Sequence, residues 1–384
     1  MRRVAIIGVG CTNVGEHWEK SLRNLLVDAA IRAMDDAEVE TVDALFVGNM
    51  MSGALQEQEH LGALLASHLG LRGIPACKVE AACASGGMAL HQAFLAVASG
   101  MYDYVMAIGG EKMTDRTTPE VTLALAMADD REYVVSTGAS FVALNALVYR
   151  FYMEKFKVPQ EDIALFSVHD HKYSVNNPHA QFRKPLSLEE IMKSPLVADP
   201  IRLFECAPIG DGAAAVVLAP LDKVKGKEGV VEIAASTVAT DHVSINERED
   251  MLTLWSTVAA SRKAYEMAKV EPKDVDVVEV HDAFSILGVI SLEDLGFAEK
   301  GKGWTLVKEG EIEKDGKVPT NTMGGLLGRG HPIGGTGLYQ VIEAYYQLTN
   351  RAGSNQVDDA KVALTQSLGG VAGTSVIHIL KYVR

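Results

Sequence analysis

Residues 76–110 read ACKVEAACASGGMALHQAFLAVASGMYDYVMAIGG, and this stretch decides the fold. A short apolar run at 76–79 predicts a strand, an alanine-rich run at 84–98 predicts a helix, and residues 104–109 predict a second strand. Strand, helix and strand in direct succession are typical of a βαβ unit with parallel strands. The stretch therefore predicts an α/β protein.

The same alternation continues on both sides of this unit. Before it, strands are predicted at 4–7 and 44–47 and helices at 21–35 and 59–69. After it, residues 111–211 are more irregular, and a strand signature returns at 213–218. The second half repeats the order: strands at 230–235, 275–280, a short extended piece near Val318, 362–365 and 375–380, with helices at 254–268, 284–295 and 335–348. This is βαβαβαββ twice, which predicts two duplicated α/β halves, 1–225 and 226–384, with an insertion at about 111–211 in the first.

Composition narrows the class of protein. The chain has 384 residues, 48% hydrophobic and 22% charged, as is typical of globular proteins. A net charge of −14 argues against nucleic-acid and anionic-membrane partners. The longest apolar run, 212–221, is too short to span a bilayer, and the N-terminus has no adequate signal sequence, so we expect a cytoplasmic protein. Four cysteines without a CxxC pair are expected to be thiols: Cys11, Cys77, Cys83 and Cys206.

The most reactive position predicted is Cys83, in the segment EAACASGGM at 80–88. It follows a strand and opens a helix, where the helix dipole and free N–H groups are expected to lower the pKa of a thiol. Small neighbours would let a carbonyl substrate approach. The alternative is a buried structural cysteine in a tight turn.

Two histidines and a glycine turn are further candidates. His331 lies in GGLLGRGHPIGGTG at 324–337, a glycine-rich loop that lacks the Gly-Lys-Ser/Thr ending of a P-loop. His281 ends an apolar strand in EVHDAF at 279–284, and ligands of α/β sheets bind at the carboxyl ends of strands. The turn SLGG at 367–370 is either a simple hairpin or a source of bare N–H groups for an oxyanion.

Other motifs carry weaker signals. Gly8-Val9-Gly10 is followed by Asn13 where a dinucleotide-binding fingerprint needs glycine. His169-Asp170-His171 has no third ligand in sight, so we expect a solvated turn and no metal. Arg183 and Lys184, in the insertion, are either solvated or meet the phosphates of a ligand.

These motifs, in this order, resemble the thiolase superfamily, specifically its sterol-carrier-protein-type and archaeal acetoacetyl-CoA thiolase branches. The resemblance covers essentially the whole chain and rests on the Cys83 segment, 211–214, 281–284, Asn321 with Gly324-Gly325, 330–337 and 367–370. It implies the five-layered α-β-α-β-α thiolase fold. It also implies that residues 111–211 form a loop domain that covers the site and receives coenzyme A.

The resemblance implies roles for individual residues. Cys83 is similar to the nucleophile that carries the acyl group as a thioester, and His331 to its base and a donor to the first oxyanion hole. His281 would donate to the thioester oxygen. The N–H groups of Cys83 and Gly369 would form the second oxyanion hole. Substrate binding is expected at Asn321, Ser367, Arg183 and Lys184, with coenzyme A and acyl-CoA as substrates and no cofactor.

The chain departs from the family at one point. Thiolases place a second cysteine, which removes the α-proton of the attacking acyl-CoA, where Ser367 or Ala283 stands here. A serine hydroxyl has too high a pKa to replace it. Either Cys206, a histidine or a water held by Ser367 transfers the proton, or the Claisen step is slow or absent.

The resemblance thus implies reversible condensation of two acetyl-CoA to acetoacetyl-CoA through an acyl-Cys83 intermediate. The alternatives are a thiolase for longer or branched 3-ketoacyl-CoA and a non-catalytic acyl-CoA-binding scaffold subunit. A homodimer or homotetramer is expected. Hydroxymethylglutaryl-CoA synthase and a small OB-fold protein are the partners implied, which would place the reaction in lipid metabolism on the mevalonate route.

Overall fold

The computed structural model describes residues 1–224 and 229–383, so the expected boundary between the halves at 225/226 lies outside the described residues. The first half contains β1 (Val4–Cys11), α1 (Leu22–Ala37), β2 (Ala44–Gly48), α2 (Ser52–Leu55), α3 (Leu61–His68), β3 (Ala76–Val79), α4 (Ser85–Ser99), β4 (Val105–Glu111) and β7 (Gly212–Pro220). The second contains β8 (Val231–Thr240), α9 (Trp255–Ala268), β9 (Val277–Glu279), α10 (Ser285–Asp294), α11 (Gly303–Lys308), α12 (Gly325–Arg329), α13 (Thr336–Leu348), β10 (Val362–Gly369) and β11 (Thr374–Tyr382).

The strand order confirms the internal duplication. The strands form the order β3-β2-β4-β7-β1-β8-β11-β10-β9, in which β1 and β8 join the two halves. The β2–β3 and β2–β4 pairs are parallel, and β4–β7 and β7–β1 are antiparallel. The second half repeats these directions, because β9–β10 is parallel and β10–β11 and β11–β8 are antiparallel. The extended piece expected near Val318 is only an isolated parallel bridge, Val278 with Thr320, at the position equivalent to β3.

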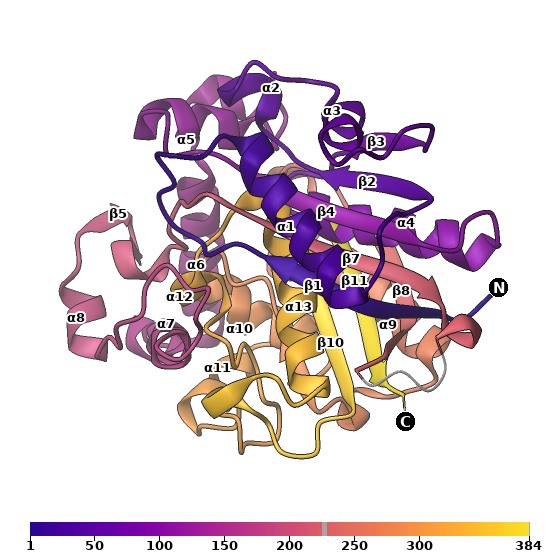
Figure 1. Ribbon diagram of the computed structural model, residues 1–384. Helices are drawn as coiled ribbons and strands as arrows, with labels where there is room; N and C mark the ends of the chain where they lie inside the picture. Colours follow the sequence, from indigo (N-terminus) through magenta and orange to yellow (C-terminus); the bar gives the residue numbers. More distant parts are fainter. Residues whose placement is uncertain (225–228, 384) are drawn as a thin grey trace.

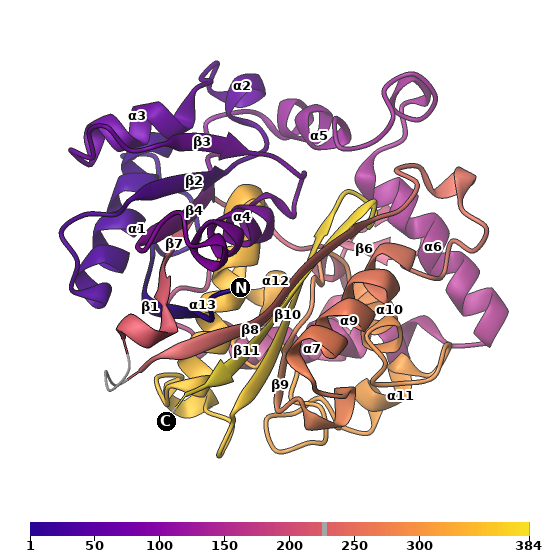
Figure 2. The same cartoon turned by 90° about the vertical axis from the view of Figure 1, so that its right-hand side faces the viewer.

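Five layers result, as expected for the thiolase fold. Figure 2 shows α4 and α13 between the two halves of the sheet, with α1 and α3 outside one half and α9 and α10 outside the other. A buried cluster from α4, α13 and strands of both halves fills the middle layer. A second cluster packs α1 and α3 against the first half, where Ser21 caps α1 by accepting the Asn24 N–H at 3.2 Å.

The insertion is more regular than predicted. It contains α5 (Thr118–Ala126), α6 (Phe141–Phe156), α7 (Gln160–Ser174), α8 (Leu188–Lys193), β5 (Leu196–Ala198) and β6 (Ile201–Arg202). Figure 1 shows these elements gathered on one side of the molecule. The expectation that His169-Asp170-His171 forms a solvated turn is wrong, because all three side chains are buried in α7. Many buried positions of α7 are polar, which hides its helical periodicity from sequence reasoning.

None of the helices in the described residues combines the length and the apolar character that crossing a membrane requires.

Candidate active site

Cys83 stands on a strained turn between β3 and α4. Ala82 has a φ of 50°, a left-handed conformation that costs energy for any residue except glycine. Ser85 holds the turn, since its hydroxyl donates to the Ala82 carbonyl at 2.6 Å and accepts the Ala81 N–H at 3.0 Å. The turn fixes the Cys83 thiol at the start of the helix, as predicted.

The structure brings Cys83, His281 and His331 together from three distant segments. The Cys83 Sγ and one ring nitrogen of each histidine all lie within 4.8 Å of one another. The two imidazoles meet edge to face, with centroids 5.2 Å apart and an interplanar angle of 84°. All three side chains are buried. A thiol beside two imidazoles is the arrangement of a nucleophile with a base and a hydrogen-bond donor.

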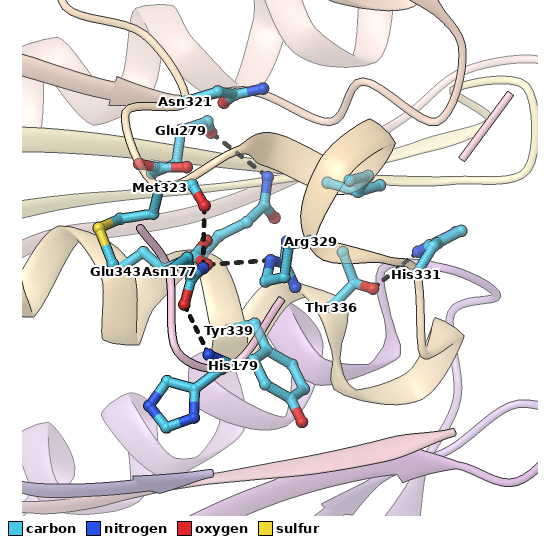
Figure 3. A network of polar contacts seen from close by, with 12 residues as sticks. Asn177, His179, Glu279, Asn321, Met323, Arg329, His331, Thr336, Tyr339 and Glu343 are labelled. Atoms are coloured by element: carbon cyan, nitrogen blue, oxygen red, sulfur yellow. Dashed lines mark hydrogen bonds and ion pairs between the residues drawn. The ribbon is translucent and has the colours of Figure 1, made fainter. Parts of the chain in front are cut away.

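The tautomer of His331 follows from its neighbour Thr336. The Thr336 hydroxyl donates its one proton to the Pro332 carbonyl at 3.2 Å, so it accepts at 2.7 Å from the Nδ1–H of His331. The free Nε2 is left as the basic nitrogen. Figure 3 shows Thr336 beside His331 at the start of α13.

A buried ion pair lies behind the His331 loop. Arg329 is fully buried, with its Nε 3.0 Å from a carboxylate oxygen of Glu343 and its guanidinium over the Tyr339 ring at 5.1 Å. Asn177 Nδ2 donates to the same Glu343 oxygen at 3.0 Å (Figure 3). This network ties α12, α13 and the insertion together beneath the site.

His281 is held by its neighbour Asp282. The Asp282 carboxylate accepts the N–H groups of Leu326, at 2.8 and 3.0 Å, and Leu327, at 3.0 Å, at the start of α12. Asn321 Oδ1 accepts the Val280 N–H at 2.9 Å. The strand end that carries His281 is therefore fixed from both sides.

Glu111 joins the two halves at the site. Its buried carboxylate accepts from Asn49 Nδ2 at 2.7 Å, the Met51 N–H at 3.0 Å and the Gly334 N–H at 3.1 Å. Burial raises its pKa to about 7 despite these bonds. Sequence reasoning missed Glu111, since no motif marks it.

Burial controls the protonation of the site. It raises the pKa of Cys83 to about 12, although a hydrogen bond from the Gly370 N–H acts in the opposite direction. The expected lowering by the helix dipole is therefore overturned, because desolvation of the thiolate outweighs it. Burial also lowers the pKa of His281 to about 4 and that of His331 well below its usual value, where His281 and Arg329 add to the effect. The resting site is a neutral thiol with neutral imidazoles.

Cys83, His281 and His331 line a cavity of about 430 Å3. Most of the remaining lining residues are apolar and come from the insertion and from the 281–287 segment. They include Met113, Leu125, Phe141, Val142, Phe182, Leu203, Phe204, Ala207, Ile209, Ala283, Phe284, Leu287 and Ile333. Apolar residues of the insertion thus cover the Cys83 thiol.

Other predicted residues lie outside the cavity lining. Gly370, with a φ of 63°, lines the cavity beside Cys83, whereas Gly369 is paired with Thr374 in the β10–β11 ladder. Asn321 and Ser367 are buried outside the lining. Arg183 and Lys184 are exposed next to the lining residue Phe182. The roles assigned to these residues and to Gly369 stay predictions.

Two titratable residues of the lining were not placed by the sequence. The sequence offers Cys206 only as one of three candidates for the missing proton-transfer group, and it predicts a solvated turn for His171. Both lie in the cavity wall. Their positions depend on how the insertion folds back over the site, which no local motif signals.

The same three groups are spaced so that they could approach a metal ion. A thiol and two imidazoles are ligands that Zn2+ accepts, but a structural zinc site uses four such groups. The largely apolar lining of the cavity favours acyl transfer over metal binding.

Fold and site together define an α/β protein of two duplicated halves, with a buried cysteine beside two imidazoles where the halves meet. The chain belongs to the thiolase family: the family model described as "Thiolase, N-terminal domain" matches residues 4–222, and "Thiolase C-terminal domain-like" matches 237–382.

Curated relatives match over nearly the full chain. The acetyl-CoA acetyltransferase of Methanothermobacter thermautotrophicus is 45% identical, and that of Methanocaldococcus jannaschii is 42% identical, each over 99% of both chains. Human sterol carrier protein 2 is 34% identical over 99% of this chain and 72% of its own. The prediction from motif order is confirmed.

Solved structures agree on the fold. The structure named "Ltp2-ChsH2(DUF35) aldolase" aligns with a TM-score of 0.87 at 22% identity, covering 100% of this chain and 98% of the other. The acetyl-CoA acetyltransferase from Syntrophomonas wolfei aligns with a TM-score of 0.77 at 18% identity and covers both chains fully.

Proposed function

We propose that this protein is an acetyl-CoA acetyltransferase, which condenses two acetyl-CoA to acetoacetyl-CoA and coenzyme A or runs the reverse thiolysis. The observation that carries the proposal is the cluster of Cys83 with two buried imidazoles within 4.8 Å. The names of relatives at 45% and 42% identity support the choice of substrate.

The first half-reaction forms a thioester on Cys83. His331 Nε2 takes the thiol proton as Cys83 Sγ attacks the acetyl carbonyl, and then passes that proton to the leaving coenzyme A sulfur. The Cys83 and Gly369 N–H groups, with Gly370 beside them, stabilise the oxyanion. Donors fixed before charge develops contribute about 2.7–4 kcal/mol each to such a step.

In the second half-reaction, the α-carbon of another acetyl-CoA attacks the acetyl-Cys83 carbonyl. His281 donates to the thioester oxygen of that second molecule, which stabilises its enolate. The group that removes the α-proton of the second acetyl-CoA passes a proton to His331, replacing the one that left with the first coenzyme A. Carbon–carbon bond formation then releases Cys83 as a thiolate, which takes this proton from His331. Neither resident cofactor nor metal takes part in this scheme.

An assay of acetoacetyl-CoA cleavage with free coenzyme A tests the proposal. We expect acetyl-CoA formation by a ping-pong mechanism, which gives parallel lines in double-reciprocal plots. Absence of cleavage in folded protein, together with retained acyl-CoA binding, would instead support a scaffold subunit.

A thiolase for longer or branched 3-ketoacyl-CoA is a second candidate, because the cavity wall is largely apolar and includes Phe141, Phe284 and Leu287. Comparison of kcat/KM for acetoacetyl-CoA and 3-ketohexanoyl-CoA decides between the two substrates. Each additional buried methylene favours the longer chain by about 0.8 kcal/mol if the cavity accepts it.

We further propose a homodimer or homotetramer in the cytoplasm. The strand β3 supports oligomerisation, because it is an edge strand that pairs only with β2 among the described strands.

A small OB-fold protein and hydroxymethylglutaryl-CoA synthase are proposed partners that would draw the reaction toward condensation and the mevalonate route. A neighbour whose name includes a DUF35 component, at a TM-score of 0.87, supports the idea of a second subunit. Co-purification of the natively expressed protein tests these partnerships.

A further inference from the structure

The proton-transfer group of the second half-reaction is the missing part of this site, and its identification rests on the proposed function. A general base or acid must lie within about 3 Å of the proton that it moves. It must therefore line the cavity that receives the second acyl-CoA. Among the described residues of the lining, the titratable side chains are Cys83, His171, Cys206, His281 and His331.

Ser367 does not belong to this set. Its side chain lies between α4 and α13: a Cβ on Gly87 would be 3.2 Å from the Ser367 Cβ, and a Cβ on Gly337 would be 2.9 Å from its Oγ. The hydroxyl is buried without a hydrogen-bond partner among the described residues. A water held by Ser367 would consequently lie outside the cavity lining.

Three of the five lining groups have other tasks. Cys83 carries the acetyl group, His331 exchanges the Cys83 proton, and His281 donates to the thioester oxygen. Cys206 and His171 remain. The ring contacts of His171 are with Phe182 and Phe204, at 6.3 and 6.4 Å, in the apolar wall.

Cys206 is placed differently, alongside the segment that carries His281. Its backbone forms an antiparallel bridge with Phe284, and the Ala207 N–H donates to the Ala283 carbonyl at 2.9 Å. The Cys206 thiol makes one weak hydrogen bond, to the Arg202 carbonyl at 3.5 Å. Ala283 adds only a methyl group to the same wall, which leaves room for a substrate.

We infer that Cys206 exchanges the α-proton of the second acyl-CoA, its thiol being supplied to the cavity from the segment that pairs with residues 283–284. His171 and His281 line the same cavity, and the Nδ1 atom of each is buried without a hydrogen-bond partner among the described residues. Burial raises the pKa of Cys206 to about 12, so the resting group is a thiol that is ready to donate.

The proton balance closes in the thiolysis direction. Cys83 Sγ attacks the 3-carbonyl of acetoacetyl-CoA while its proton passes to His331. The C2–C3 bond breaks, its electron pair takes the proton of the Cys206 thiol at C2, and acetyl-CoA leaves. The Cys206 thiolate then recovers a proton from the His331 imidazolium, and acetyl-Cys83 remains to react with coenzyme A. Condensation is the reverse of these steps.

The test separates acylation from carbon–carbon bond cleavage. Cys206→Ala and Cys206→Ser are compared with wild type for acetylation of Cys83 by acetyl-CoA, followed by intact-protein mass spectrometry, and for thiolysis of acetoacetyl-CoA. We expect acetylation within about threefold of wild type. Thiolysis should fall about 100-fold or more, the usual effect of losing a general acid.

Two further variants sharpen the result. Ala283→Cys in the Cys206→Ala background returns a thiol to the adjacent backbone and should restore thiolysis at least about tenfold. Cys77→Ala, at an exposed position on β3, is the matched control and should leave both reactions unchanged. If Cys206→Ala has a lower Tm than wild type, Cys206→Ser, which nearly keeps the volume of the thiol, is used for the comparison instead.

Retention of thiolysis in the Cys206 variants would overturn the inference. So would a parallel loss of acetylation and thiolysis, which indicates a structural role, or a selective loss of thiolysis in His171→Gln instead. An inactive wild type would overturn the proposed function as well, so the two failures are distinguishable.

Discussion

At the scale of single residues, the site keeps its reactive groups neutral until substrate arrives. Burial opposes both a thiolate at Cys83 and an imidazolium at His331. Transfer of the proton from the Cys83 thiol to His331 before substrate binds is therefore unfavourable. The proton is instead expected to move as the Cys83 sulfur attacks the carbonyl, when the oxyanion donors stabilise the charge that develops.

This protonation state predicts the pH dependence of acylation. A neutral imidazole is the active form, and a lowered pKa keeps it neutral at more acidic pH, so activity should be lost only as the pH falls through the lowered value. For the base His331, burial together with His281 and Arg329 holds the pKa well below its usual value. We expect the rate of Cys83 acetylation to stay nearly constant between about pH 8 and pH 6, across the ordinary histidine pKa. A rate constant of Cys83 acetylation that falls to half its value near pH 6.5 would contradict this.

The hydroxyl of Thr336 is predicted to set the tautomer of His331. Thr336→Val removes the partner of Nδ1–H, and we expect acetylation about fivefold slower because one hydrogen bond is worth about 1 kcal/mol. The matched control is Thr349→Val, at the other end of α13, whose hydroxyl bonds the Tyr345 carbonyl at 2.7 Å. Equal rates in the two variants would exclude this role.

At the scale of elements, the site depends on backbone segments that pack so closely that no side chain fits between them. A Cβ on Gly109 of β4 would lie 2.2 Å from the Gly334 carbonyl oxygen, and one on Gly86 of α4 would lie 2.7 Å from the same atom. These contacts bring the His331 loop against the Cys83 helix. The glycine-rich motifs are therefore explained by close approach of three elements.

Gly109→Ala is predicted to push these elements apart. The collision is with backbone, so we expect a loss of about 1–3 kcal/mol in the free energy of unfolding. Acetylation should slow more than tenfold, since a misplacement of about 1 Å can cost about 100-fold. Gly15→Ala is the control, because a Cβ there meets nothing within 4 Å. Denaturant unfolding and acetylation rates check both effects, and a Gly109→Ala variant as active as Gly15→Ala would refute the explanation.

At the same scale, local sequence signals mark some elements of the site and leave others unmarked. The strand ends and helix starts that carry Cys83, His281 and His331 have strong local signals, and their expected elements are present. The helix α7 does not, because polar residues such as Ser167 and Asp170 occupy buried positions. Cys206 and Gly370 reach the cavity through long-range folding, so their places could not be predicted.

At the scale of the whole molecule, duplication builds one site from two halves. Cys83 comes from the first half and both imidazoles come from the second, so the site exists only where α4 and α13 meet. Neither half folded alone is expected to react with acetyl-CoA.

The open edge of β3 predicts association between chains. Light scattering after size exclusion should give two or four times the chain mass of 41.2 kDa. The Pro75 and Val79 carbonyls accept from β2, so the N–H of Lys78, between Cys77 and Val79, points to the open edge. Lys78→Pro removes this N–H and should lower that mass, since proline disrupts edge pairing. A wild type of 41.2 kDa at micromolar concentration would contradict the prediction.

In the proposed reaction, Cys83 carries the acyl group. The most direct measurement is mass spectrometry of the protein after mixing with acetyl-CoA, with the modified residue located by peptide mapping. We predict one acetyl group on Cys83 that free coenzyme A removes, and its absence in Cys83→Ser. Unmodified Cys83, or an acetyl group on another residue that persists in Cys83→Ser, would contradict the account.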